Sequence, residues 1–293
     1  MMKVAVIGGS GFLGSYVCDE LLCRGFEVHV LDRKPSDYLR KGMNFQTCDI
    51  MDSQGLLEIF ESSKFDGVYN FAGLADLDIA FHEPVLAMEL NVMGNLAVLE
   101  ACRKNQVKRY IYASSAYANS SRGSFYGISK LTSEKLIEEY SYRYGQQYSI
   151  LRYGSVYGER ASEPNGIYCL LKEAFETGAI IHKGDGEEVR EYIHAKDAAR
   201  LSVDVLESSE FIDCHLILTG VERLKYKDLL SMISEILNDS VKIQYEDEET
   251  TGHYRFTPYS FRPQTAMKLA ANPFIDMGQG LVDCLREIQE AKK

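Results

Sequence analysis

A tyrosine and a lysine stand four positions apart in the segment Tyr126–Lys130 (YGISK). In a helix, residues four apart lie on one face, one turn from each other. Tyrosine has an ordinary pKa of about 10, so it needs a nearby positive charge to lose its proton near neutral pH. The pair therefore indicates a phenol that exchanges a proton while the lysine stabilises the phenolate. By itself the pattern is common and usually marks a solvated helix face.

A second group of residues is typical of a phosphate-binding turn. The segment Val4–Gly14 (VAVIGGSGFLG) reads as a strand, a glycine-rich turn and the start of a helix. Its glycines fit both G-x-G-x-x-G and G-x-x-G-x-x-G. They allow a tight turn, close approach of a pyrophosphate to the backbone, and close packing of helix on strand. An ordinary glycine-rich turn is the alternative. The predicted cofactor contacts here are Gly8, Gly11, Phe12, Leu13 and Gly14.

Asp32 ends the second predicted strand, eighteen positions after the last of these glycines. A carboxylate at about this spacing binds the adenosine ribose hydroxyls of a dinucleotide, and it repels a 2′-phosphate. We therefore expect NAD rather than NADP, although Arg33 and Lys34 follow directly and soften that preference. Asp49 and Ile50, after the third strand, are placed to hold the adenine, unless Asp49 only caps the next helix.

The elements that must position these residues alternate between strand and helix through the first half of the chain. Such alternation predicts a doubly wound parallel sheet with helices on both faces, the Rossmann type of α/β fold. The predicted strands are Val4–Ile7, Val28–Leu31, Phe45–Cys48, Val68–Phe71, Tyr110–Ala113 and Tyr148–Leu151, and the predicted helices are Phe12–Arg24, Ser53–Ser62, Pro84–Lys104 and Gly127–Arg143.

The amino-acid composition changes after about residue 154, where glycine, proline and charged residues become more frequent. Strands are expected at Glu191–His194 and Leu216–Thr219, with helices opening near Lys196, over Tyr226–Leu237 and at the C-terminus. We expect residues 1–155 to form the dinucleotide-binding domain, its sheet completed by about 190–219. Residues 156–189 and 220–293 should form a smaller, interleaved substrate lobe.

The composition excludes several classes of partner. The net charge is −11, which disfavours nucleic acid and anionic membranes as partners. No signal peptide is evident, and no stretch is expected to supply the roughly 20 apolar residues that span a bilayer. Seven cysteines without a CxxC pair suit reduced thiols, so a cytoplasmic location is expected. The histidines and cysteines lack metal-ligand spacing, and no G-x-S-x-G elbow is present.

With these motifs in place, the chain resembles the extended short-chain dehydrogenase/reductase family, and within it the UDP-glucose 4-epimerases and their relatives. The resemblance runs along essentially the whole chain. Besides the glycine turn and the Tyr126/Lys130 pair, it is carried by Asn70–Leu74 (NFAGL), Leu90–Gly94 (LNVMG), Tyr112–Ala116 (YASSA), Leu151–Ser155 (LRYGS), Val189–His194 (VREYIH) and Lys196-Asp197.

The resemblance implies a role for each matching residue. Ser115 would hydrogen-bond the reacting sugar hydroxyl, Tyr126 would exchange its proton, and Lys130 would hold the nicotinamide ribose. Asn91 would support Lys130 from behind. Arg190 and Arg255 would clamp the diphosphate of a nucleotide sugar, because guanidinium groups bind phosphate bidentately; a surface ion pair is the alternative for both. Further implied cofactor contacts are Phe71, Ala72, Gly73, Ser114 and Tyr153, and Ser155 is an implied substrate contact.

The chain also departs from the family pattern. Only eleven positions separate Ser115 from Tyr126, so the loop that borders the sugar pocket is shorter than usual. Ser155 stands where the family has a pocket asparagine, and Ala75 or Asp76 replaces a common lysine. The segment Tyr254–Phe261, which contains Arg255, replaces the usual Arg-x-Gly-Asp pattern.

The resemblance also narrows the reaction. A 4,6-dehydratase would carry an Asp-Glu pair after the active serine, where this chain has Ala116-Tyr117. The glutamate of a decarboxylase and the Cys/His pair of a 3,5-epimerase-reductase are likewise missing from this neighbourhood. What remains is NAD-dependent C4 epimerisation of a UDP- or other nucleotide-linked hexose through a 4-keto sugar. The alternatives are an NAD(P)H-dependent reductase of a keto-sugar nucleotide and a non-catalytic dinucleotide-binding relative.

A homodimer is expected as well. The predicted helices Pro84–Lys104 and Gly127–Arg143 are apolar on more than one face. In the family such helices pair across a two-fold axis. The alternative is that both only pack against the sheet.

Overall fold

The structure, a computed structural model, describes residues 1–120, 122–163, 165–246 and 266–291. Eight parallel strands form one sheet in the order β14-β11-β6-β5-β4-β1-β2-β3. The strand order reverses between β1 and β4, where a doubly wound sheet opens a crevice for ligands. The strands are β1 Lys3–Ile7, β2 Glu27–Asp32, β3 Met43–Thr47, β4 Gly67–Asn70, β5 Arg109–Ser115, β6 Gln147–Tyr153, β11 Cys214–Leu218 and β14 Met267–Leu269.

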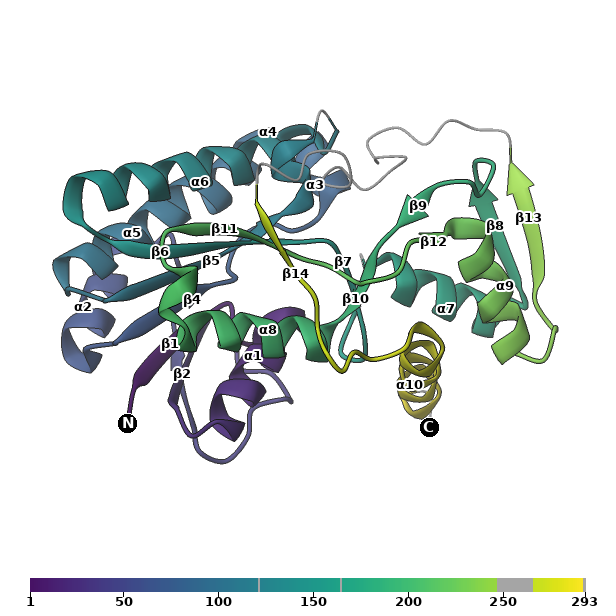
Figure 1. Ribbon diagram of the computed structural model, residues 1–293, viewed down its shortest axis with the longest axis horizontal. Coiled ribbons are helices and arrows are strands. Elements are labelled where there is room, and N and C mark those ends of the chain that lie inside the picture. Colours follow the sequence, from purple (N-terminus) through teal and green to yellow (C-terminus); the bar gives the residue numbers. More distant parts are fainter. Residues whose placement is uncertain (121, 164, 247–265, 292–293) are drawn as a thin grey trace.

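Helices cover both faces of this sheet (Figure 1). On one face, α1 (Phe12–Cys23) packs against α8 (Ala195–Glu207). On the other, α5 (Gly94–Lys104) contacts both α2 (Ser53–Ser63) and α6 (Ser124–Tyr144). Each face has its own apolar core, which explains why the central strands read as continuous apolar runs. The predicted Rossmann-type α/β fold is confirmed.

A smaller group of elements lies beyond the carboxyl ends of the strands (Figure 1). Its core is made of apolar side chains from three helices, including Leu171, Leu230 and Leu285. Three two-stranded pairs accompany them, β7 with β10, β9 with β12 and β8 with β13. The helices are α7 Gly166–Thr177, α9 Tyr226–Ile236 and α10 Met277–Glu290, and the strands are β7 Ser155–Tyr157, β8 Ala179–Lys183, β9 Val189–Arg190, β10 Tyr192–His194, β12 Leu224–Lys225 and β13 Lys242–Glu246.

The structure differs from the predicted elements mainly in this second half. The predicted strand Glu191–His194 corresponds to β10, with Glu191 just outside it, and β10 pairs with β7 rather than joining the large sheet. Strand β14, which comes from the range assigned to the smaller lobe, forms an edge of the large sheet. The exact boundaries of the two lobes therefore stay a prediction.

One helical stretch corrects the expectation about apolar segments. Residues Pro84–Lys104 form one continuous run, made of α4 (Pro84–Met88), the π-helical turn η1 (Glu89–Met93) and α5. By length and composition alone this run is apolar enough to cross a membrane, and it is the one such helix among the described residues. The prediction that no stretch reaches this length is therefore wrong. Part of the run is buried against α2 and α6, as in the core helix of a globular protein.

Candidate active site

The glycine turn between β1 and α1 is packed too tightly for side chains. A Cβ added to Gly14 would lie 2.3 Å from the carbonyl oxygen of Gly8, and one added to Gly8 would lie 2.7 Å from the backbone nitrogen of Ala72. Gly8 also has a φ of +77°, a conformation that glycine adopts without strain. Helix α1 starts after Gly11, and a glycine at the N-cap has no side chain to cap the first N–H groups. The turn thus leaves backbone donors open toward an anion.

Asp32 is held directly beside this turn. Its carboxylate accepts hydrogen bonds from the backbone nitrogens of Ser10, at 3.0 Å, and Arg33, at 2.7 Å. Around the same edge of the sheet, Asp49 accepts from the backbone of Met51 at 2.9 Å, and Ile50 is buried. The carboxylate of Asp32 is therefore fixed at the end of β2, where an adenosine ribose lies in dinucleotide-binding folds.

The segment after β4 closes the other side of the turn. Phe71 stacks on Tyr69, with 6.0 Å between the ring centres, and lies 6.2 Å from the ring of Tyr153. Gly73 has a φ of +140°, and a Cβ there would lie 2.4 Å from Oδ1 of Asn91. The absence of a side chain at Gly73 is therefore what lets this segment pack closely against the side chain of Asn91.

The predicted proton-exchange pair lies in the first two turns of α6. The ammonium nitrogen of Lys130 lies 5.8 Å from the ring centre of Tyr126 and donates to the carbonyl of Ala113 at 2.9 Å. Both side chains are buried. Burial lowers the pKa of Lys130 from 10.5 to about 8, while Glu134 acts in the opposite direction. Lys130 is therefore charged at neutral pH and close to Tyr126.

Ser115 ends β5 and faces the same cavity as Tyr126. Its Oγ accepts a hydrogen bond from the backbone nitrogen of Tyr117 at 3.3 Å. The cavity has a volume of about 610 Å³ and extends to the smaller lobe. It brings together six of the predicted site residues: Phe12, Ser115, Tyr126, Tyr153, Ser155 and Arg190. Arg255 lies outside the described residues.

Asn91 occupies the π-helical turn η1 and ties two segments together. Its side-chain amide accepts a hydrogen bond from the backbone N–H of Leu74 at 2.7 Å and donates to the backbone carbonyl of Leu74 at 3.0 Å. The same amide nitrogen donates to Oγ of Ser129 at 2.8 Å. The backbone carbonyl of Asn91 accepts a hydrogen bond from the hydroxyl of Ser133 at 2.7 Å. These contacts reach the residue beside Lys130, so Asn91 acts as a positioning residue for α6 and the segment after β4.

The side-chain hydroxyls of two predicted cofactor contacts are hydrogen-bonded to other side chains in the protein interior. Ser114 donates to a carboxylate oxygen of Glu134 at 2.5 Å, and the Tyr153 hydroxyl lies 2.7 Å from Oγ of Ser202. Glu134 is fully buried and is bound by Arg152. Sequence reasoning missed Glu134, because a glutamate on a helix normally faces solvent and its partner lies on another element.

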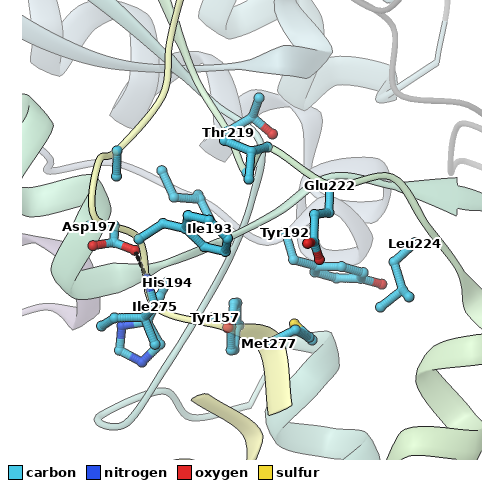
Figure 2. A pocket seen from close by; sticks show the side chains of 14 residues that line it. Tyr157, Tyr192, Ile193, His194, Asp197, Thr219, Glu222, Leu224, Ile275 and Met277 are labelled. Atoms are coloured by element: carbon cyan, nitrogen blue, oxygen red, sulfur yellow. Dashed lines mark hydrogen bonds between the residues drawn. The ribbon is translucent and has the colours of Figure 1, made fainter. Parts of the chain in front are cut away.

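A second, much smaller pocket lies between the lobes (Figure 2). Its volume is about 40 Å³, and apolar side chains such as Ile193 and Met277 make up much of its wall. Asp197 accepts a hydrogen bond from the backbone of Ile275 there, at 2.6 Å. Tyr192 lines both pockets. None of the predicted proton-exchange residues reaches this pocket, so the larger cavity is the candidate active site.

The doubly wound sheet, the glycine turn, Asp32 and the buried Tyr126/Lys130 pair are together typical of a dinucleotide-dependent enzyme. The chain belongs to the NAD dependent epimerase/dehydratase family, whose model matches residues 4–215. The resemblance inferred from the sequence is therefore confirmed, and NAD is the cofactor of this family.

Similar proteins support the same assignment. A UDP-glucose 4-epimerase of Yersinia pestis is 30% identical over 240 residues, which cover 68% of this chain and 71% of that protein. One of Lacticaseibacillus casei is 29% identical over 231 residues, covering 68% and 70%. Among solved structures, a Thermus thermophilus UDP-glucose 4-epimerase in complex with NAD is 25% identical, with a TM-score of 0.83 over 99% of this chain and all of that one. A Thermotoga maritima UDP-glucose 4-epimerase with UDP-glucose is 23% identical, with a TM-score of 0.86 over the whole of both chains.

The residues of this chain fit NAD. The positions that a Cβ would fill, at Gly8 and Gly14, keep the backbone open at the uncapped start of α1. The fixed carboxylate of Asp32 supplies acceptors for the two ribose hydroxyls and would repel a 2′-phosphate. We therefore propose that Gly8, Gly11, Gly14 and Asp32 would hold the dinucleotide.

Proposed function

We propose that the chain is a cytoplasmic UDP-hexose 4-epimerase that inverts C4 through a 4-keto sugar. The observation that carries this proposal is the buried ammonium of Lys130 beside the Tyr126 ring, with Ser115 lining the same cavity. These groups suffice to move a proton on and off a sugar hydroxyl. The names of the similar proteins, UDP-glucose 4-epimerases, support the choice of a UDP-linked sugar.

Tyr126 is the proposed acid–base residue. The positive charge of Lys130 favours the phenolate form of Tyr126, which can then take the proton of the C4 hydroxyl. Ser115, held by the backbone of Tyr117, donates a hydrogen bond to the same sugar oxygen. When Tyr126 returns the proton, the oxygen at C4 becomes a hydroxyl again.

When bound, NAD would supply the hydride acceptor and donor that the side chains of this chain lack. Inversion then requires the 4-keto sugar to present its other face before the hydride returns. The cavity, with a volume of about 610 Å³, and the small side chains Ala75 and Ser155 in its wall leave room for this rotation. The rotation needs the nucleotide part to stay fixed while the sugar moves.

Arg190 is the proposed anchor for the diphosphate. It lies on β9 of the smaller lobe and lines the cavity, half-buried. Guanidinium groups bind phosphate oxygens through paired N–H donors and keep their charge. Ser155 is the proposed contact to the sugar from the end of the sheet. We keep Arg255 as a second proposed phosphate contact on the strength of the sequence alone.

The test is turnover without added cofactor. Purified protein is incubated with UDP-glucose, UDP-galactose and further nucleotide sugars, and the products are separated by chromatography. We expect interconversion of C4 epimers and its loss in Tyr126→Phe, which keeps the ring and removes the acid–base hydroxyl. Turnover only of a keto sugar, and only with NADH or NADPH, would establish the reductase instead. Inertness with tight NAD binding would establish a non-catalytic relative.

We also propose that the enzyme is a homodimer. Several large apolar side chains on α4, η1 and the start of α6 are exposed, which is unusual for a monomer's surface. We call them the α4–α6 patch, defined as Val85, Leu86, Met93, Phe125, Ile128 and Leu131. Burial in a dimer would also cover apolar residues of the run Pro84–Lys104 that the chain itself leaves exposed, since only 44% of its apolar window is buried.

A further inference from the structure

Tyr117 lies two positions after Ser115, in a short 3₁₀ turn, η2 (Ala116–Asn119). Its backbone nitrogen donates to Oγ of Ser115, so the position of Tyr117 is coupled to that of Ser115. The Tyr117 side chain is half-buried and lines the same cavity as Tyr126. Nothing in the proposed epimerisation uses this second tyrosine.

The Tyr117 ring forms a wall next to the reacting groups. It meets the Tyr126 ring edge to face, with 6.2 Å between the ring centres and 72° between the planes. Leu77, from α3 (Leu77–His82), packs in the same apolar cluster and also lines the cavity. The wall of Tyr117 and Leu77 is thus apolar and stands beside the Ser115 and Tyr126 hydroxyls.

Gly123 supports the Tyr117 ring from behind. A Cβ at Gly123 would lie 2.6 Å from Cδ1 and 2.9 Å from Cβ of Tyr117. Gly123 also has a φ of +97°, which a side chain would strain. Only a glycine at this position lets the short loop between Ser115 and Tyr126 pass so close to the ring.

We propose that Tyr117 is a specificity-determining residue that limits the group on C5 of the sugar. This inference rests on the proposed function, in which Ser115 and Tyr126 both bind the oxygen on C4. A wall beside them faces the carbons next to C4, namely C3 and C5. In common hexoses and pentoses C3 carries a hydroxyl, whereas C5 carries hydrogen in xylose, a hydroxymethyl group in glucose and a carboxylate in glucuronic acid.

The apolar character of the wall sets the direction of the preference. A carboxylate placed against the face of the Tyr117 ring and against Leu77 loses water, and neither the ring carbons nor Leu77 can donate a hydrogen bond in return. A hydrogen or a hydroxymethyl group loses less. Tyr117 therefore selects for small, uncharged groups on C5 and against uronic acids.

The experiment compares kcat/KM for C4 epimerisation of UDP-xylose, UDP-glucose, UDP-glucuronic acid and UDP-N-acetylglucosamine. Within each variant the values are divided by that for UDP-xylose, so that a general loss of activity cancels. For Tyr117→Ala we expect the relative value for UDP-glucuronic acid to rise about tenfold, the effect of a small change in pocket volume. UDP-N-acetylglucosamine differs from UDP-glucose at C2, which does not adjoin C4, so the ratio of these two should stay the same.

Three further variants separate the ring from its hydroxyl and from general damage. Tyr117→Phe keeps the wall and should keep the wild-type preference. Gly123→Ala displaces the ring without removing it and should change the preference. Gly145→Ala is its matched control, because Gly145 also has a positive φ, of +69°, but its Cβ would meet nothing within 4 Å. Thermal unfolding checks that each variant is folded.

A relative value for UDP-glucuronic acid that changes less than about twofold in Tyr117→Ala would overturn the inference, as would a change confined to UDP-N-acetylglucosamine. If Tyr117→Phe alters the preference as much as Tyr117→Ala, the hydroxyl and not the wall is responsible. Wild-type protein that epimerises none of the four sugars refutes the proposed function itself, a result distinct from both.

Discussion

Glu134 and Arg152 form a buried, two-pronged ion pair directly behind the candidate active site. Nε and Nη2 of Arg152 donate to the two carboxylate oxygens of Glu134 at 2.9 and 2.6 Å. Their side chains are 0% and 6% exposed. Glu134 lies one helical turn beyond Lys130 and also accepts from the hydroxyl of Ser114, which precedes Ser115. The pair therefore joins α6 to β5 and β6 at the point where the proposed acid–base residues meet.

Replacing Glu134 with glutamine should destabilise the protein strongly. Glu134→Gln keeps the shape but leaves the guanidinium of Arg152 buried without a countercharge, a change that costs about 3–5 kcal/mol. Urea unfolding measures the loss. Glu138→Gln, on the same helix with a side chain 32% exposed, is the matched control and should cost less than about 1 kcal/mol. Equal losses in the two variants would contradict this account of the buried pair.

Lys130 should make the folded state less stable at neutral pH. Its pKa is lowered by burial from 10.5 to about 8, so between these values the unfolded chain holds a proton that the folded chain has released. Stability from this group therefore rises with pH across that window, and below pH 8 its cost is about 3 kcal/mol. Lys130→Met should be more stable than wild type at pH 7, while losing epimerase activity.

Unfolding of Lys130→Met and wild type in urea from pH 7 to pH 10 checks this sign. The stability difference should shrink as the pH rises, because wild-type Lys130 becomes neutral. A difference that stays constant over this range would show that the ammonium is not penalised by burial. Lys135→Met, an exposed lysine on the same helix, serves as the control and should show no such trend.

The large sheet could be predicted because parallel strands covered on both faces are continuous apolar runs. All four residues of β4 are buried, and so are four of the five in β1. Strand β14 gives no such signal, because two of its three residues are exposed and only its partner β11 defines it. Strand β13 is similar, with four exposed residues and a pairing to β8 that depends on the tertiary fold.

In the candidate site too, local patterns can be predicted from the sequence, whereas contacts between distant elements cannot. Glycine spacing and the Tyr126/Lys130 pair are local patterns, so the sequence predicts them. The ion pair of Glu134 with Arg152 joins a helix to a strand, and no spacing within either element indicates it. Tyr117 could be recognised as unusual in its position after Ser115, but its place against Gly123 and Tyr126 required the folded chain.

Asp32 should set the choice of cofactor. Its carboxylate is fixed by the backbone nitrogens of Ser10 and Arg33, and it would repel the 2′-phosphate of NADP. In Asp32→Ser we expect the Kd for NAD to rise about tenfold and the preference over NADP to fall, because the ribose loses a charged hydrogen-bond partner. Titration calorimetry with both cofactors measures this. Asp49→Ser, at the next strand end, should change the two affinities by equal factors. A preference that is unaltered in Asp32→Ser would remove Asp32 from the cofactor site.

The α4–α6 patch should govern the oligomeric state. Ile128 is 53% exposed near the start of α6, and Met93 on η1 is exposed to the same extent. Ile128→Lys would place a charge in the proposed dimer interface, where it could not be solvated, and should shift the protein to a monomer. Light scattering during gel filtration measures the mass directly. Val221→Lys, at an exposed apolar residue of the smaller lobe outside the patch, should leave the mass unchanged. Wild-type protein that runs as a monomer at micromolar concentration would rule out the dimer, and a dimer that survives Ile128→Lys would place its interface elsewhere.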